Sequence, residues 1–450
     1  MRNLAILITT TLLTSLPAQV APGYALVAWK PTNPTATGGM RLVDRAGVNQ
    51  VVTGLSPQTL GTTRYDGAQS VLVTNTGIVF AGLGADNRTG VAPIPLDLRR
   101  ILLSGTVAAL DTQFTTLMQV PAGQLWKVSD IKERADGSLL VAAAEILATA
   151  NPMPQAAVFT VSSTGVVATV PTTGLPFGSL EDIADAGDRF VVGSIQSAFV
   201  VNSDFWSLPF SPTGAPAYRI CMLTQTSAIG GIDLDVDGSI LIAVTYQGGS
   251  VARVAHAPSS TPVQVSATPT TAAVAEVLPG PGLAAVFTQP GLVAAPLNLV
   301  DCNAGTSSVW ATIVVQNPVD VSVRAASAVY GPASRQSSVA AWLGSDGGNP
   351  TVGNANFGLR FGGTTGGLAA VLLGVGRANL ALPFGTVLIN PAPVVALPSV
   401  TLPNTGRARV ALPVPSNPSL SGGVLNAQAA VVQIAVPTID LSRGLEITVL

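Results

Sequence analysis

The sequence predicts an all-β chain, a six-bladed β-propeller followed by a small antiparallel β-sandwich. Three observations lead to this fold class: the composition, a glycine turn that recurs at near-regular intervals, and a change of pattern near residue 300. Of 450 residues, 48% are hydrophobic and only 10% are charged, with 46 glycines and 34 prolines. So many aliphatic residues can bury a core, whereas so much glycine and proline argues against long helices and coiled coils.

The chain begins with the features of a secretory signal peptide. Arg2 gives a positive start, residues 4–16 form an apolar stretch too short to span a bilayer, and Ala18 is a small residue where cleavage would follow. We therefore expect residues 1–18 to be a signal peptide. The mature chain is expected to be secreted, periplasmic or at the cell surface, without a membrane span.

The repeated unit is a turn glycine followed at once by a short aliphatic run. It occurs six times, at Gly23, Gly77, Gly137, Gly187, Gly238 and Gly282. A period of about 40–50 residues matches one four-stranded propeller blade. Because a single blade cannot cover both of its faces while a closed ring can, the repeats predict a propeller over residues 22–300. Five or seven blades remain alternatives to six.

One repeat resembles known families. Residues 232–243 read Ile-Asp-Leu-Asp-Val-Asp-Gly-Ser-Ile-Leu-Ile-Ala, and a related turn occurs at Asp136-Gly137. These strands resemble blades of the NHL and SMP-30/gluconolactonase-type six-bladed propellers. The resemblance implies a ring around a central channel, with ligands at one axial mouth, and it carries over no catalytic residues.

The C-terminal part follows a different pattern. Residues 301–345 contain strands that either close the last blade or serve as a linker, and residues 346–450 contain about six short strands between turns. Such a tail predicts an antiparallel β-sandwich. The stretch 415–422, the Ala427-Gln428-Ala429 run that follows and Ser442–Leu445 resemble the recurrent C-terminal β-domain of secreted bacterial multi-module proteins. That resemblance implies an exported protein rather than an activity.

Charge and cysteine content limit the possible partners. The net charge is −2, only three residues are lysine, and Arg99-Arg100 is the longest basic cluster. A nucleic-acid surface needs several cations on one face, so we expect no nucleic-acid partner. Cys221 and Cys302 could form a disulfide or remain two buried thiols, because spacing does not fix the geometry of a bridge.

One segment suggests a metal site. Asp233, Asp235 and Asp237 alternate before Gly238, so their carboxylates share a strand face, and such oxygen ligands suit Ca²⁺. Leu241 and Val244 stand where an EF-hand loop would place its ninth and twelfth ligands. A solvent-facing turn is therefore the alternative to calcium binding, and no other cofactor is expected.

No catalytic or cofactor-binding residue is assigned from the sequence. His256 is the only histidine and lies in a Pro/Ser-rich turn typical of a surface, and neither a GxSxG motif nor a phosphate loop is present. Carboxylates that lie just before the turns of inner strands could instead reach a channel mouth. These are Asp130, Glu133, Glu181, Asp182 and Asp233.

Three functions remain open, and the sequence leans away from an enzyme. The leading expectation is an exported, non-catalytic propeller that binds an extracellular protein or polymer or forms part of a surface. A channel plugged by aliphatic side chains would favour it. The second is a metal-dependent lactonase- or lyase-like hydrolase, favoured by a divalent ion held by channel acids. The third is a carbohydrate- or polymer-binding protein, favoured by tryptophans gathered in a groove. The candidates are Trp29, Trp126, Trp206, Trp310 and Trp342.

Overall fold

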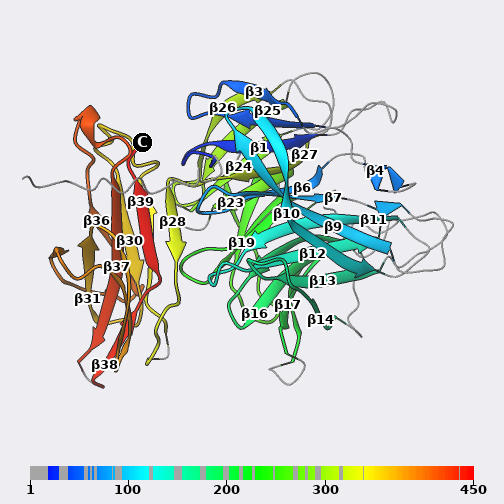
Figure 1. Ribbon diagram of the computed structural model, residues 1–450. Helices are drawn as coiled ribbons and strands as arrows, with labels where there is room; N and C mark the ends of the chain where they lie inside the picture. The colour runs from blue at the N-terminus through cyan, green and yellow to red at the C-terminus, as the bar shows by residue number, and fades with distance from the viewer. Residues whose placement is uncertain are drawn as a thin grey trace, which may run out of the picture.

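The computed structural model is almost entirely β-structure (Figure 1). It describes residues 19–29, 39–54, 59–60, 63–64, 68–83, 85–86, 94–120, 125–145, 155–172, 179–195, 202–211, 216–224, 229–246, 249–266, 272–278, 282–288, 295–313, 318–337, 339–434 and 436–450. The expected signal peptide, residues 1–18, lies outside this set. Within it, the structure has no helix long and apolar enough to cross a membrane.

Six antiparallel sheets of the propeller contain four consecutive paired strands each, which are the blades. From the inner to the outer strand they are β27 (Pro318–Val323), β1 (Ala25–Trp29), β2 (Gly39–Val43) and β3 (Asn49–Val52) in blade 1; β6 (Ala68–Val73), β7 (Val79–Leu83), β9 (Ile94–Ser104) and β10 (Val107–Val120) in blade 2; β11 (Leu125–Glu133), β12 (Leu139–Glu145), β13 (Ala156–Val161) and β14 (Val167–Val170) in blade 3; β15 (Ser179–Asp185), β16 (Arg189–Ile195), β17 (Asn202–Pro209) and β18 (Tyr218–Thr224) in blade 4; β19 (Ile229–Leu234), β20 (Ile240–Tyr246), β21 (Gly249–Val254) and β22 (Val263–Ser266) in blade 5; and β23 (Ala272–Leu278), β24 (Leu283–Thr288), β25 (Ala295–Asp301) and β26 (Thr306–Ile313) in blade 6. Short strands β4 (Thr59–Leu60) and β5 (Thr63–Arg64) pair with each other, and β8 (Ala85–Asp86) pairs with β11.

The blades form a closed ring. Each inner strand contacts the inner strand of the next blade, from β6 through β11, β15, β19 and β23 to β27, and β27 returns to β6. The first blade combines both ends of the propeller, because β27 pairs with β1 in the register Ala25↔Val323. The predicted fold class is confirmed.

The six turn glycines explain the repeat. Each has a positive φ, from 64° at Gly282 to 86° at Gly77, a backbone conformation that favours glycine. Gly77 and the four that follow it lie between the inner and second strands of blades 2–6. Gly23 has the corresponding place before β1, where its N–H donates to the carbonyl of Arg324 beyond β27. The aliphatic run after each glycine is the second strand, and in β12 every residue is buried.

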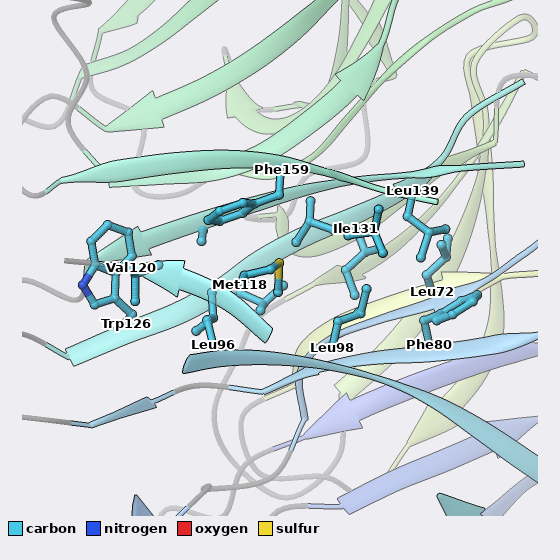
Figure 2. Close-up of a cluster of buried hydrophobic side chains, with 14 of the residues drawn as sticks. Leu72, Phe80, Leu96, Leu98, Met118, Val120, Trp126, Ile131, Leu139 and Phe159 are labelled. Carbon is cyan, nitrogen blue, oxygen red and sulfur yellow. The ribbon is translucent and has the colours of Figure 1, made fainter. Parts of the chain in front are cut away.

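Apolar side chains fill the spaces between neighbouring blades. Figure 2 shows one such cluster between blades 2 and 3, in which Phe80 and Leu98 lie near Ile131 and Leu139, with Phe159 on the next strand. Burial on both faces accounts for continuous aliphatic strands rather than alternating ones. Cys221 and Cys302 are free, buried thiols in two different clusters of this kind.

The C-terminal strands form a β-sandwich beside the propeller (Figure 1). One sheet contains β28 (Ser327–Tyr330), β39 (Gly444–Thr448), β37 (Val424–Gln433), β31 (Leu368–Gly374) and β34 (Val394–Ala396), with β35 (Val400–Thr401) paired to β31 and β38 (Thr438–Leu441) paired to β37. The other contains β29 (Trp342–Asp346), β30 (Gly358–Gly362) and β36 (Arg407–Ala411). A hairpin, β32 (Arg377–Leu382) and β33 (Gly385–Ile389), and the short 3₁₀ turn η1 (Pro418–Leu420) complete it.

The two sandwich sheets share one core, in which Phe361 of β30 belongs to the same cluster as Val371 of β31 and Ala429 of β37. Residues 301–345 were expected to close the last blade or to link the propeller to the sandwich. They supply strands to the propeller and to the sandwich. They contain β26 and β27 of the propeller and β28 of the sandwich, and they lead into β29.

Candidate active site at the channel mouth

Charged and polar side chains from all six inner strands converge on the axis of the ring. They are Ser70 (β6), Asp130 and Lys132 (β11), Asp182 (β15), Asp233 (β19), Glu276 (β23) and Asp320 (β27). Lys132 is electrostatically coupled to acids of blades 3, 4, 5 and 6, and Asp320 of blade 1 is coupled to Asp130. Groups on different blades are therefore close together, and five carboxyls share one ammonium group.

Irregular pairing between the inner and second strands positions some of these side chains. In every blade the register between the inner and second strands shifts by one residue, and such bulges twist a strand and re-aim its side chains. Asp130 and Asp182 directly follow the shift. Asp130 Oδ2 accepts the N–H of Ile183 in the next blade at 3.1 Å. Asp320 Oδ2 likewise accepts Val71 N–H at 2.7 Å, so these carboxylates also hold neighbouring blades together.

Lys132 is the cation of the ring. Its Nζ lies 3.2 Å from Glu276 Oε2 and 3.6 Å from Asp130 Oδ2, and the side chain is only 6% exposed. Burial opposes its charge, but the carboxylates of Asp130 and Glu276 prevail and raise the pKa of Lys132 well above its ordinary value. Lys132 is therefore an ammonium ion at any physiological pH.

Four acids of the ring have raised pKa values. Burial raises the pKa of Glu276 to about 8 and that of Asp233 to about 6, against the opposing effect of Lys132 in both cases. Burial raises the pKa of Asp320 to about 7, and burial together with nearby Asp130 raises the pKa of Asp182 well above its usual range. Near pH 7, Glu276 therefore holds a proton while Asp233 is mostly ionised, the arrangement in which one carboxyl can donate a proton and another can accept one.

A cavity of about 860 Å³ opens above this part of the ring, between the propeller and the sandwich. Lys132, Asp233 and Glu276 line it from the propeller. Arg377 and Arg443 line it from the sandwich side. This volume is in the range of small-molecule sites, which combine apolar walls with a few convergent polar groups. The cavity therefore brings a proton donor, a proton acceptor and fixed cations together.

The predicted calcium segment is divided in the structure. Asp233 faces the ring, whereas Asp235 accepts hydrogen bonds from Arg253 at 2.7 Å and from both terminal nitrogens of Arg360 at 2.5 and 3.1 Å. Asp237 pairs with Arg407 at 2.7 Å and with Arg253 at 3.3 Å. In the described part of the chain no group of three or more His, Cys, Asp or Glu side chains is arranged to hold a metal ion. Calcium binding at this segment stays a prediction.

The Asp235–Arg360 pair joins the propeller to the sandwich, and we expect it to matter for stability. Asp235→Ala should lower the free energy of unfolding by about 3–5 kcal/mol, because it leaves the buried Arg360 guanidinium without its carboxylate. Chemical denaturation measures the change. Asp346→Ala is the matched control, since it removes a more exposed ion pair with Arg409 and should cost about 1 kcal/mol or less. Equal losses in the two variants would contradict the expectation.

The other predicted carboxylates lie in two places. Glu133 lines the cavity and accepts the N–H of Asn75 at 2.6 Å, and burial raises its pKa. Glu181 is not among the cavity-lining residues and pairs with Lys127 at 2.7 Å.

His256, expected at the surface, is partly buried. Its Nε2 lies 2.9 Å from Ser207 Oγ. That oxygen is buried and also accepts from Arg189 at 2.8 Å, so this pair offers no exposed nucleophile.

The five tryptophans do not gather in a groove. Trp126 is buried between blades 2 and 3, and Trp206 packs against a cluster of blades 3 and 4. Trp29 and Trp310 pack against the cluster between blades 6 and 1, and Trp342 lines the cavity. The aromatic platform expected of a polymer-binding protein is therefore not formed by these side chains.

Sequence reasoning missed Lys132, Glu276, Asp320 and Arg443. A usable signal existed for one of them: Asp130, Asp182, Asp233 and Glu276 are each an acidic residue in an aliphatic strand, five to seven positions before a turn glycine. Asp320 has no such signal, because the glycine that follows its strand in space is Gly23, at the other end of the chain.

No protein-family model matches this sequence, and a search of curated proteins finds no match. Solved structures with a similar arrangement include puromycin hydrolase, at 13% identity and a TM-score of 0.39, with 76% of this chain and 51% of that chain covered. A structure described as a 6-phosphogluconolactonase from Bacteroides uniformis has 12% identity and a TM-score of 0.40, with 66% and 98% covered. The chain thus spans about half the length of puromycin hydrolase. These findings name neither an NHL nor an SMP-30 protein.

The leading expectation of a non-catalytic propeller is wrong. A structural or binding propeller was expected to have its channel plugged by aliphatic side chains, whereas this ring carries five carboxyls and a lysine that open in part into a cavity. The hydrolase alternative fits the channel better.

Proposed function

We propose that this protein is a hydrolase of esters or lactones that works by carboxyl acid–base catalysis in the cavity at the channel mouth. The observation that carries the proposal is the pair Asp233 and Glu276, which line one cavity with pKa values of about 6 and about 8. Pairs of carboxyls whose surroundings separate their pKa values are typical of acid–base sites.

The chemistry follows from the protonation states. Ionised Asp233 accepts a proton from a water molecule while the oxygen of that water attacks the substrate carbonyl carbon. The carbonyl oxygen becomes negatively charged. When the carbonyl re-forms, the bond to the leaving oxygen breaks, and Glu276 donates its proton to that oxygen. Asp233 then releases the water proton to solvent, and Glu276 takes up a proton from solvent. Both side chains are thereby returned to their starting protonation states.

Lys132 provides the positive charge in this scheme. Its ammonium lies beside Glu276, where it also favours negative charge that develops on the substrate. The metal-dependent alternative considered from the sequence would place a divalent ion among the channel acids. Because Lys132 already stands among these carboxylates as a cation, we propose a hydrolase in which this lysine takes the electrostatic part of a metal ion.

The pH dependence of hydrolysis tests the proposal. We expect kcat/KM on a small lactone or aryl ester to follow a bell-shaped curve, rising as Asp233 ionises near pH 6 and falling as Glu276 loses its proton near pH 8. A chelator such as EDTA should leave the rate unchanged. Absence of hydrolysis across a panel of esters and lactones would overturn the proposal. Loss of activity with EDTA would instead favour a metal-dependent hydrolase.

Export remains part of the proposal. The apolar stretch of residues 4–16 supports secretion to the periplasm, the medium or the cell surface. Detection of the mature chain without residues 1–18 in an extracytoplasmic fraction is the corresponding test.

A further inference from the structure

Arg443 is a cation of the cavity wall on the sandwich side. It lies between β38 and β39, where its Nε donates to the carbonyl of Gly331 at 3.1 Å. One edge of the guanidinium is thus fixed by the sandwich backbone. Burial lowers the pKa of Arg443, while Asp185, Asp233 and Glu133 favour its charged form from a greater distance. An arginine in this state remains charged but has lost part of its hydration.

The other cations of the cavity wall are already paired. Lys132 contacts Asp130 at 3.6 Å, Arg134 contacts Asp185 at 3.4 Å, and Arg377 contacts Glu446 at 2.8 Å. Over the ranges that the structure describes, Arg443 has no carboxylate within 4 Å. A desolvated guanidinium without a counter-ion is unfavourable, and an anion that binds beside it relieves that cost.

We propose that Arg443 binds an anionic group of the substrate, a carboxylate or a phosphate. This inference rests on the proposed hydrolase function and narrows its substrate class to anionic esters or lactones. The terminal nitrogens of a guanidinium present two parallel N–H donors, which match two oxygens of either group. The cavity of about 860 Å³ is large enough for a small ligand that reaches from this arginine toward the acids of the ring.

Titration calorimetry tests this site without any turnover. Inorganic phosphate and succinate are titrated separately into the wild-type chain at constant ionic strength, with sodium chloride as the reference anion. We expect at least one of the two to bind, and the one that binds identifies the anionic group. Arg443→Gln should weaken that binding at least about tenfold, as expected for losing a charge-assisted hydrogen bond. Arg443→Lys should give an intermediate loss, because it keeps the charge without the paired donors.

Two controls make the outcome decisive. Arg219→Gln changes a half-exposed arginine on β18 outside the cavity and should leave anion binding unchanged. Thermal unfolding of each variant separates loss of binding from loss of folding. Binding of neither anion to the wild type, or equal binding by a folded Arg443→Gln variant, would overturn the inference.

The inference and the proposed function fail in different ways. If anions bind through Arg443 but no ester or lactone is hydrolysed, the anion site stands and the hydrolase does not. If hydrolysis shows the bell-shaped curve while Arg443→Gln leaves the KM of anionic and neutral esters unchanged, the hydrolase stands and the anion site does not.

Discussion

Replacing Lys132 with methionine is expected to lower the free energy of unfolding by about 3–5 kcal/mol at pH 7, because it leaves buried carboxylates without their cation. The methionine side chain has a similar length, so the change removes charge rather than volume. Asp130 and Glu276 lose their nearest positive charge, and Asp182 and Asp233 lose a favourable interaction at longer range. Urea denaturation at pH 7 measures the effect.

A matched control lies on the same strand. Lys127→Met removes a more exposed ion pair with Glu181, which should cost about 1 kcal/mol or less. At pH 5 the loss caused by Lys132→Met should shrink, because Asp320 and Asp233 gain protons between pH 7 and pH 5 in the folded chain. Equal losses in the two lysine variants, or a loss independent of pH, would show that Lys132 does not neutralise the ring.

Replacing Glu276 with glutamine is expected to reduce kcat for ester or lactone hydrolysis by about 10²–10⁴-fold, the usual contribution of a general acid. Glutamine keeps the shape of the side chain but has no acidic proton to donate to the leaving oxygen. The fall in activity near pH 8 should disappear from the residual rate, since Glu276 is the group assigned to that limb.

Asp233→Asn should give a loss of similar size and remove the limb near pH 6 instead. Glu181→Gln serves as the control, because Glu181 is not among the cavity-lining residues. A Glu276→Gln variant that folds and retains full activity would exclude this residue as the proton donor.

The propeller could be predicted because its signal is local and repeated. A glycine with positive φ closes the turn before each buried second strand, so Gly137 and Gly238 mark equivalent places in two blades. The last propeller strand, β27, is not followed by such a glycine turn, since β27 pairs with β1 almost three hundred residues away in the chain.

The candidate site was only partly visible in the sequence. Asp130, Asp182 and Asp233 could be recognised as acids near inner-strand turns, and all three do lie in the ring. Lys132 could not, because a single lysine in a strand looks like a surface residue until neighbouring blades surround it with acids. Arg443 was also hidden, since the sandwich places it over the propeller only in three dimensions.

The pairing of β27 with β1 also has a consequence for biogenesis. Blade 1 stays incomplete until residues 318–323 have been synthesised, so the first three strands of the propeller must wait for nearly three hundred later residues. Contacts at such long sequence separation slow folding and leave unpaired strand edges exposed meanwhile. In a nascent chain truncated before β27, the ring of blades should therefore stay open. The free edge of β1 should then make this chain prone to associate with other chains.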